Sequence, residues 1–250
     1  PILTNTDLER IRRIHNHVDD AFATKKLGIC YPASDGASGM RGAIQKLCER
    51  ATETVRQGNN ILILSDRCQE VDKVAIPALL ATAAVHHHLI REGLRTEVGL
   101  VLETGEARQV HDFCLLGGYG AEAINPYLAF DVIDSLADEM PSVTLEEARQ
   151  NYVKAIKKGM LKVMSKMGIS TFQSYCGAQI FDAIGLNGEF IDRYFTGTPS
   201  LIEGIGLDEV AAETVRRHEN AFGSKTYRRM ELEVGGEYAY RLRGEEHVWT

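Results

Sequence analysis

The sequence predicts an α/β fold, rich in helix, with a partial or open layer of parallel strands that resembles an incomplete β/α barrel. Short apolar runs alternate with longer helical stretches, a pattern typical of a parallel sheet. The runs are largely unbroken, as expected for strands covered on both faces. They number too few to close an eight-stranded barrel, so we expect an open layer.

Four apolar runs rich in β-forming residues are the predicted strands. They are 61–64, 98–102, 121–124 and 169–172. Each is four or five residues long, which suits a buried strand better than a helix of ten or more.

Two predicted helices begin with a capping box, in which two side chains each satisfy an unpaired N–H group at the helix start. Thr6 with Glu9 forms the first box, and Thr144 with Glu147 forms the second. The second helix has an apolar stripe over 145–167, where apolar residues recur every three or four positions.

Proline and glycine mark the ends of other helices. Pro77 can open a helix because its missing N–H has no partner there anyway, and we expect this helix to stop at Gly93. Gly168 is the expected end of the 145–167 helix. Gly120 lies in a string resembling a dinucleotide fingerprint, but a helix precedes it and a strand follows, the reverse of the required context. We therefore predict a helix-to-strand turn there.

Composition and charge exclude several classes of protein. The chain has 250 residues, of which 44% are hydrophobic and 25% charged, the balance of an ordinary globular protein. Its net charge is −7 and its basic residues form no long run, which argues against nucleic-acid binding. We find neither a membrane-spanning stretch nor a signal peptide, and expect a cytoplasmic protein.

We expect residues 1–222 to form one domain and residues 223–250 to form a linker or arm. The second segment has little helical periodicity and contains Gly235, Gly236 and Gly244. Because the chain begins with Pro1 and its tail has no clear end, we expect a piece of a larger protein.

The five cysteines predict no disulfide framework and no metal site. Their number is odd, and no CxxC spacing occurs. Reduced thiols are the expected state in a cytosolic compartment. The residues are Cys30, Cys48, Cys68, Cys114 and Cys176.

Polar side chains follow each predicted strand, and ligands of parallel α/β folds bind at the carboxyl ends of strands. The alternative is that these side chains cap helices and hold loops together. We favour the structural role because acidic and hydroxyl residues are common at such turns. The strand-end residues are Ser65, Asp66, Arg67, Glu103, Thr104, Glu106, Asn125, Tyr127 and Ser174, with Gln173 and Tyr175 beside the last.

The chain shows no catalytic or metal-binding motif. A helical metal clamp needs ligands four positions apart, but the residue four after His87 is Arg91, so we expect the three consecutive histidines at 86–88 to serve packing and local hydrogen bonding. Ser38 does not lie in a GxSxG nucleophile motif.

Six blocks of the sequence resemble the central region of the glutamate synthase large subunit. Their order and spacing also fit, and the resemblance spans nearly the whole chain. The blocks are 61–67, 76–96, 103–106, 118–129, 166–171 and 174–181.

The resemblance implies a large enzyme that makes glutamate from glutamine and 2-oxoglutarate. In that family an amidotransferase domain with an N-terminal cysteine nucleophile releases ammonia, which crosses a tunnel to a β/α barrel holding FMN beside a 3Fe–4S cluster. A β-helical domain closes the chain. The central domain joins the two active sites and resembles the flavin barrel in layout.

Residue by residue, the resemblance assigns no catalytic residue to this chain. Pro1 stands where the nucleophilic cysteine would be, and the cluster cysteines and flavin-binding glycines have no counterpart here. We therefore expect no cofactor in this chain and no activity from it alone. Its expected partners are the amidotransferase and flavin domains of the same polypeptide, or further copies of itself. The alternative is a self-standing α/β module that binds flavin or another small molecule at the strand-end residues.

Overall fold

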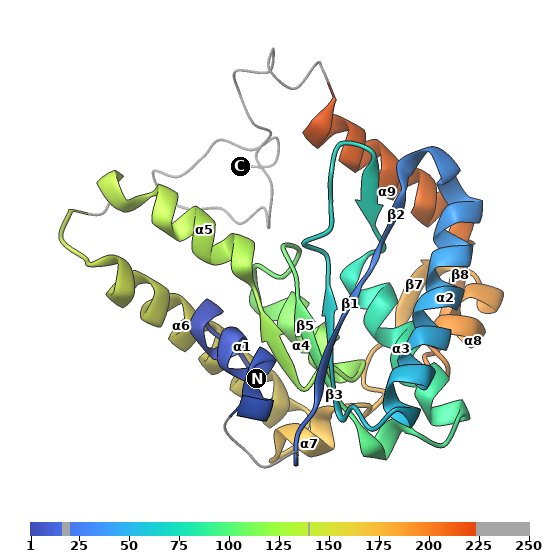
Figure 1. Cartoon of the computed structure of the whole chain (residues 1–250), viewed down its shortest axis with the longest axis horizontal. Helices are drawn as coiled ribbons and strands as arrows, with labels where there is room; N and C mark the ends of the chain where they lie inside the picture. The colour runs from blue at the N-terminus through green and yellow to red at the C-terminus, as the bar shows by residue number, and fades with distance from the viewer. Residues whose placement is uncertain (17–20, 140, 224–250) are drawn as a thin grey trace.

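The computed structural model describes residues 1–16, 21–139 and 141–223. Its centre is a four-stranded parallel sheet in which the strands follow the order of the chain (Figure 1). The outermost strands each pair with a single strand of this sheet, so the layer is open, as predicted. In order, the strands are β1 (Thr24–Gly28), β3 (Ile61–Ser65), β5 (Gly99–Glu103) and β6 (Ala123–Asn125).

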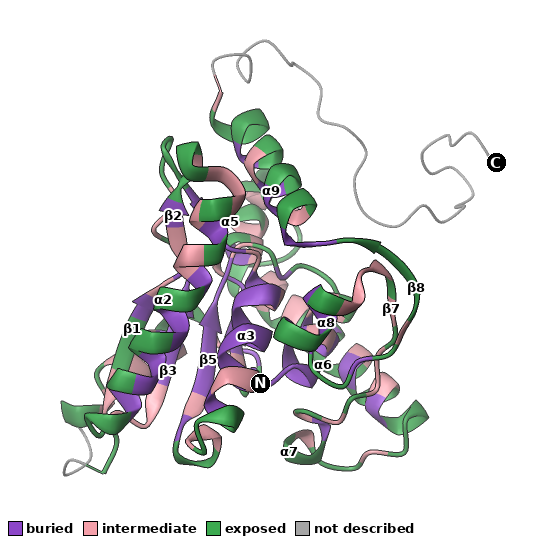
Figure 2. Cartoon of the chain, turned by 90° about the vertical axis from the view of Figure 1, so that its right-hand side faces the viewer, coloured by how far each residue is buried: buried purple, intermediate pink, exposed green. Residues whose placement is uncertain are grey.

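Helices connect the parallel strands and cover one face of the sheet. α2 (Gly36–Arg56) joins β1 to β3, α3 (Ala78–Arg91) joins β3 to β5, and α4 (Val110–Gly118) joins β5 to β6. Figure 2 shows β3 and β5 buried beside α3. The short antiparallel pair of β2 (Cys30–Pro32) and β4 (Lys73–Ala75) extends two of these connections beyond the sheet.

Both faces of the sheet are covered, as the unbroken apolar runs predict. Leu62 and Leu64 of β3 belong to the main core, which includes side chains of α2, α3 and α4. Ile63, between them, packs with Val101 and with Leu8 of α1 (Asn5–Arg12) on the opposite face. Successive side chains of a strand point to opposite faces of the sheet, and those of β3 therefore meet apolar partners on both faces.

The remaining elements follow β6. α5 (Tyr127–Ser135) packs against α6 (Leu145–Lys166), and α6 packs against α4. The chain continues through α7 (Phe172–Tyr175), β7 (Ala183–Leu186), α8 (Gly188–Tyr194), β8 (Ser200–Ile205) and α9 (Leu207–Phe222), with single 3-10 turns at Ile14–Asn16, Ala33–Asp35, Arg95–Glu97 and Ala137–Glu139. β7 and β8 form a separate parallel pair.

The predicted helix ends are mostly confirmed. α3 starts after Pro77, and Gly93 has a positive φ of 72°. Thr144 and Glu147 form their capping box, and Gly168, just after α6, also has a φ of 72°. Gly120 lies in a helix-to-strand turn between α4 and β6 with a φ of 108°.

Two local predictions are wrong. The run 169–172 is not a strand: the short helix α7 begins at Phe172, and the Tyr175 hydroxyl donates to the Cys114 carbonyl oxygen at 3.1 Å. The first capping box uses Thr4 and Asp7, two positions before the predicted pair, because Thr4 has the extended conformation that an N-cap residue needs.

The expectation of reduced, unpaired cysteines is also wrong. Cys30 and Cys68 form a disulfide that spans 38 residues, and it links the segment after β1 to the loop after β3. The other three cysteines are free. Sequence spacing gave no sign of this pairing, because the two residues meet only when β1 and β3 lie side by side.

Among the described residues, no helix combines the length and the apolar character needed to cross a bilayer. The predicted linker over 223–250 lies, except for its first residue, outside the described residues.

We predict that Gly120→Ala destabilises the chain more than Gly58→Ala. Both residues have positive φ, at 108° and 90°, so each alanine carries a strain of about 1–2 kcal/mol. A Cβ at Gly120 would lie 2.3 Å from His86 Nδ1, whereas one at Gly58 meets nothing within 4 Å. Overpacking should add about 1–3 kcal/mol at Gly120 only. Urea unfolding measures both, and equal losses would contradict this account of Gly120.

We predict that the Cys30→Ala/Cys68→Ala variant loses about 2–4 kcal/mol of unfolding free energy, the usual contribution of a disulfide. Reductant should lower the urea midpoint of the unmodified chain and leave that of the double variant unchanged. Cys176→Ala, which removes a free thiol, is the matched control. If reductant does not change the urea midpoint of the unmodified chain, the two sulfurs are not bonded.

Candidate functional site

A buried carboxylate at the carboxyl end of β5 organises the strand ends. Glu103 Oε2 accepts hydrogen bonds from Ser65 Oγ at 2.5 Å and from Arg12 Nη2 at 2.6 Å. Arg67 Nε lies 3.1 Å from Oε1, and Lys26 Nζ lies 3.6 Å from Oε2. These five residues, the Glu103 cluster, come from α1, β1, β3, the loop after β3 and β5.

The cluster keeps Glu103 ionised although its side chain is only 2% exposed. Burial by itself would raise the pKa of this carboxyl. The Ser65 hydrogen bond, the Arg12 hydrogen bond and charge, and the Lys26 charge outweigh burial and hold the pKa below its ordinary value. A buried charge of this kind is tolerated only because it is fully partnered.

A second buried carboxylate, Asp66, holds the loop after β5. Its Oδ2 accepts from Thr104 Oγ1 at 2.7 Å and from the Gly105 N–H at 2.8 Å. Burial raises the pKa of Asp66, although hydrogen bonds from Thr104, Gly105 and Tyr127 oppose the rise. The pKa values of Asp66 and Glu103 are therefore shifted in opposite directions.

Two further strand-end residues, Tyr127 and Glu106, make additional connections. The Arg67 guanidinium lies 3.9 Å from the centre of the Tyr127 ring, a cation–π contact that ties the loop after β3 to α5. Glu106 Oε2 accepts from the Ala78 N–H at 2.7 Å. It thereby caps α3, whose own N-cap residue, Pro77, makes no side-chain cap.

Asn125 and Ser174 do not join these contacts. Asn125 donates to the Leu3 carbonyl at 3.1 Å and to Asn5 Oδ1 at 2.9 Å, and so holds the N-terminal segment against β6. Ser174, on α7, accepts a hydrogen bond from the N-cap residue Thr171, and α7 lies at the amino ends of the strands (Figure 1). The sequence therefore brought Ser174 into the set only through the incorrect fourth strand.

The prediction from sequence missed Arg12 and Lys26, because neither follows a strand. Arg12 lies on α1 and Lys26 lies within β1. The one available signal was indirect, since a glutamate at the end of an apolar run must find a cation if it is buried.

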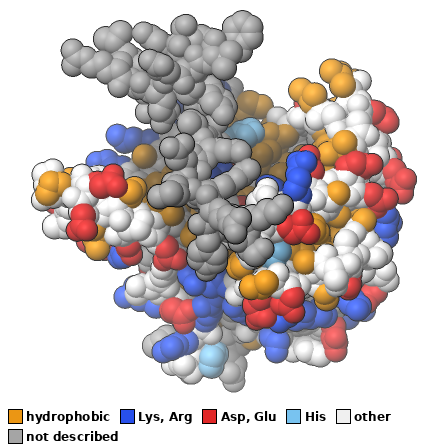
Figure 3. Space-filling model, turned by 90° about the horizontal axis from the view of Figure 1, so that it is seen from above, with side chains coloured by type: hydrophobic (Ala, Val, Ile, Leu, Met, Phe, Trp, Pro, Cys, Tyr) orange, Lys and Arg blue, Asp and Glu red, His pale blue; other side chains and the backbone are white. Residues whose placement is uncertain are grey.

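Four of the polar side chains at the strand ends are buried among the described residues. Ser65, Asp66, Glu103 and Thr104 are at most 2% exposed. Cavities of about 560 and 620 Å³ lie elsewhere, beside α2 and between α1 and α6, and none of these four residues lines them. Figure 3 looks down on the molecule from above, and acidic and basic side chains are interspersed over that face.

The three histidines of α3 have protein partners or bury their rings. His86 Nδ1 accepts from Arg95 Nε at 2.9 Å, and His88 Nε2 lies 2.8 Å from Thr52 Oγ1. Burial, with the charges of Arg95 and His87, lowers the pKa of His86 to about 3, so its ring stays neutral. No group of three potential metal ligands occurs within the described part of the chain.

We predict that Glu103→Gln lowers the unfolding free energy at pH 7 by about 2–3 kcal/mol, because Arg12 keeps only Glu9 as a partner and Arg67 loses its carboxylate. The control Glu122→Gln removes a half-exposed partner of Arg95 and should cost about 1 kcal/mol or less.

The pH dependence has a definite sign. The pKa of the Glu103 carboxyl is lower in the folded state than in the unfolded state, so the ionised carboxyl stabilises the fold at pH values above the unfolded-state pKa. This stabilisation is lost as the pH falls through the folded-state pKa. The difference between the unmodified chain and Glu103→Gln should therefore shrink on acidification from pH 7 to pH 4. Urea unfolding at both pH values measures it, and a constant difference would contradict the assigned ionisation.

Comparison with known proteins places the chain in a family. The family model described as the glutamate synthase central domain matches residues 1–187. The chain is 42% identical over 254 residues to the glutamate synthase [NADPH] large chain of Bacillus subtilis, covering 100% of this chain and 16% of that protein. It is 38% identical over 252 residues to glutamate synthase [NADH] of Schizosaccharomyces pombe, covering 99% and 12%.

A third relative is the chloroplastic ferredoxin-dependent glutamate synthase of Spinacia oleracea, 40% identical over 262 residues, with 99% of this chain and 16% of that protein covered. The chain thus spans less than one fifth of the length of these relatives. The family match covers most of the described residues, including the whole four-stranded sheet. The chain belongs to the glutamate synthase central-domain family.

Proposed function

We propose that this chain is the structural central domain of a glutamate synthase, an oxidoreductase that makes glutamate from glutamine and 2-oxoglutarate. It fixes the distance between the amidotransferase and flavin sites and contributes wall to the ammonia path between them. The observation that supports this role is the Glu103 cluster, in which Ser65, Arg12 and Arg67 all contact one buried carboxylate at the strand ends.

Parallel α/β folds bind ligands at the carboxyl ends of their strands, so the burial of the side chains there is relevant to function. Ser65, Asp66 and Glu103 are buried, and Ser65, Asp66 Oδ2 and Glu103 make hydrogen bonds to neighbouring elements, whereas Asp66 Oδ1 has no hydrogen-bond partner among the described residues. A rigid edge of this kind suits a spacer. Rigidity matters there, because misplacing catalytic groups by about 1 Å can cost roughly a hundredfold in rate.

The proposal assigns the cofactors and partners to the rest of the polypeptide. FMN and the 3Fe–4S cluster belong to the flavin domain, residues 1–222 form the central domain, and residues 223–250 lead toward the flavin domain. The exposed apolar side chains Ile184, Leu201 and Ile202 on the β7–β8 pair fit contact with a neighbouring domain, or with another copy when the chain is isolated. We also propose that the protein is located in the cytoplasm.

We predict that Arg67→Ala, made in the full-length polypeptide that contains this chain, uncouples its two reactions. Loss of the Glu103 and Tyr127 contacts should loosen the loop after β3 and open the ammonia path. Glutamine hydrolysis should continue while free ammonia released per glutamine rises severalfold. Paired assays of ammonia and glutamate measure this.

Arg216→Ala is the matched control, because within residues 1–223, as far as the structure describes them, the ion pair of Arg216 is an exposed one with Glu213. This control should leave the amount of free ammonia released per glutamine unchanged. An unchanged ratio in Arg67→Ala as well would refute a role of the strand ends in coupling.

A further inference from the structure

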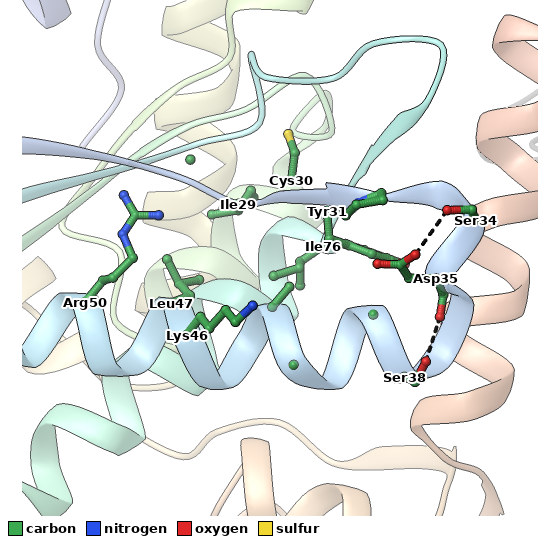
Figure 4. A pocket seen from close by; sticks show the side chains of 15 residues that line it. Ile29, Cys30, Tyr31, Ser34, Asp35, Ser38, Lys46, Leu47, Arg50 and Ile76 are labelled. Atoms are coloured by element: carbon green, nitrogen blue, oxygen red, sulfur yellow. Dashed lines mark hydrogen bonds between the residues drawn. The ribbon is translucent and has the colours of Figure 1, made fainter.

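A groove beside α2 has features of a binding site that the proposed structural role does not use. The cavity of about 560 Å³ runs between the segment 28–32 and α2, with Ser34 and Asp35 at one end (Figure 4). We call it the α2 groove. Gly42 helps to keep it open, since a Cβ built on Gly42 meets nothing within 4 Å.

The basic residues of α2 divide into two kinds. Arg41 pairs with Asp208 at 3.0 Å, and Arg56 pairs with Glu92 at 2.9 Å, both on neighbouring helices or their caps. Lys46 and Arg50 form no ion pair with any described residue, and both line the α2 groove. Figure 4 shows the Arg50 side chain rising from α2 toward the strand segment that forms the opposite wall, and the Lys46 side chain extending along α2.

The carboxylates of α2 itself are used elsewhere. Glu49 Oε1 accepts from Gln45 Nε2 at 2.9 Å, and Glu53 Oε1 accepts from Gln57 Nε2 at 3.1 Å. Lys46 and Arg50 are four positions apart, so they lie on one helix face, where like charges destabilise the helix. An anion between them would remove that repulsion.

A buried hydroxyl provides a second, independent sign of a ligand. Tyr31 lines the groove and is 4% exposed, yet its hydroxyl has no hydrogen-bond partner among the described residues. A buried polar group without a partner is costly and rare. Burial raises the pKa of Tyr31 to about 12, so the hydroxyl remains a neutral donor and acceptor near pH 7.

Asp35 is the acidic residue that lines the same cavity, at the end away from Arg50. Its Oδ1 accepts from Ser34 Oγ at 3.0 Å. The groove therefore has a cationic end, and an end with hydroxyl groups and one carboxylate, which suits a ligand whose charge is concentrated at one end.

We propose that the α2 groove binds a small organic oxyanion, with its carboxylate or phosphate group between Lys46 Nζ and the Arg50 guanidinium. Arginine engages both groups through two parallel N–H donors, and lysine adds a point charge. The Tyr31 hydroxyl supplies a hydrogen bond for the rest of the ligand. The α2 groove and the Glu103 cluster share no residue.

The test is an NMR titration of the ¹⁵N-labelled 250-residue chain with sodium phosphate and, separately, with sodium succinate, at constant ionic strength. We expect saturable shifts of the Gly39 and Gly42 amides, which line the groove. Saturation with phosphate alone identifies a phosphorylated ligand, and saturation with succinate alone identifies a carboxylate. No saturable shift with either anion overturns the proposal.

Two variants test the charge and the cavity separately. Lys46→Gln/Arg50→Gln should weaken binding roughly tenfold or more, because it removes the charge-assisted bonds. Gly42→Leu keeps both cations but fills the groove with a side chain. Leucine favours the helix over glycine by about 1 kcal/mol, so this variant should fold. It should not bind the anion. Binding unchanged in either variant contradicts the assigned site.

The matched control is Lys162→Gln/Lys166→Gln, which removes the same two charges, also four positions apart, from an exposed face of α6. It should bind like the unmodified chain. Equal weakening in this control would show that general surface charge, and not the α2 groove, attracts the anion.

Discussion

The ionised Glu103 carboxylate is the constraint on which the strand ends of this domain depend. A charge buried this deeply is stable only with partners on all sides. Those partners come from α1, β1, β3 and the loop after β3, so four separate parts of the chain must meet at one point. The contact also explains how β1, a polar strand at the open edge of the sheet, is held in place: Lys26 turns toward Glu103.

Further links act on the same loops. Asp66 joins the loop after β3 to the loop after β5, and the Cys30–Cys68 disulfide joins the segment after β1 to the loop after β3. In a reducing cytoplasm the covalent link would open. The Asp66 hydrogen bonds and the Glu103 cluster would then remain as links between these loops.

The sequence predicted the features that depend on local patterns and missed those that depend on contacts between residues far apart in the chain. The apolar runs of β3 and β5 were recognised because both faces of the sheet are covered, so no polar residue interrupts them. β1 was missed because an edge strand tolerates lysines, as at Lys25 and Lys26. The run 169–172 was assigned to a strand because its apolar residues pack against the core from a turn and a short helix.

The same distinction applies to the site. Ser65, Asp66, Glu103 and Thr104 were found because they follow strands, and strand ends of a parallel sheet share one edge. Arg12 and the Cys30–Cys68 pair were not found, because their partners are 91 and 38 residues away in the chain. No periodicity or spacing marks contacts between residues so far apart.

The central claim is that the strand ends form a closed structural edge and hold no cofactor. Titrating the purified chain with FMN, followed by flavin fluorescence and thermal unfolding, tests this most directly. The account predicts no saturable binding and no stabilisation. Saturable binding that raises the unfolding temperature, and that is lost in Arg67→Ala, would show instead that the strand ends are a flavin site.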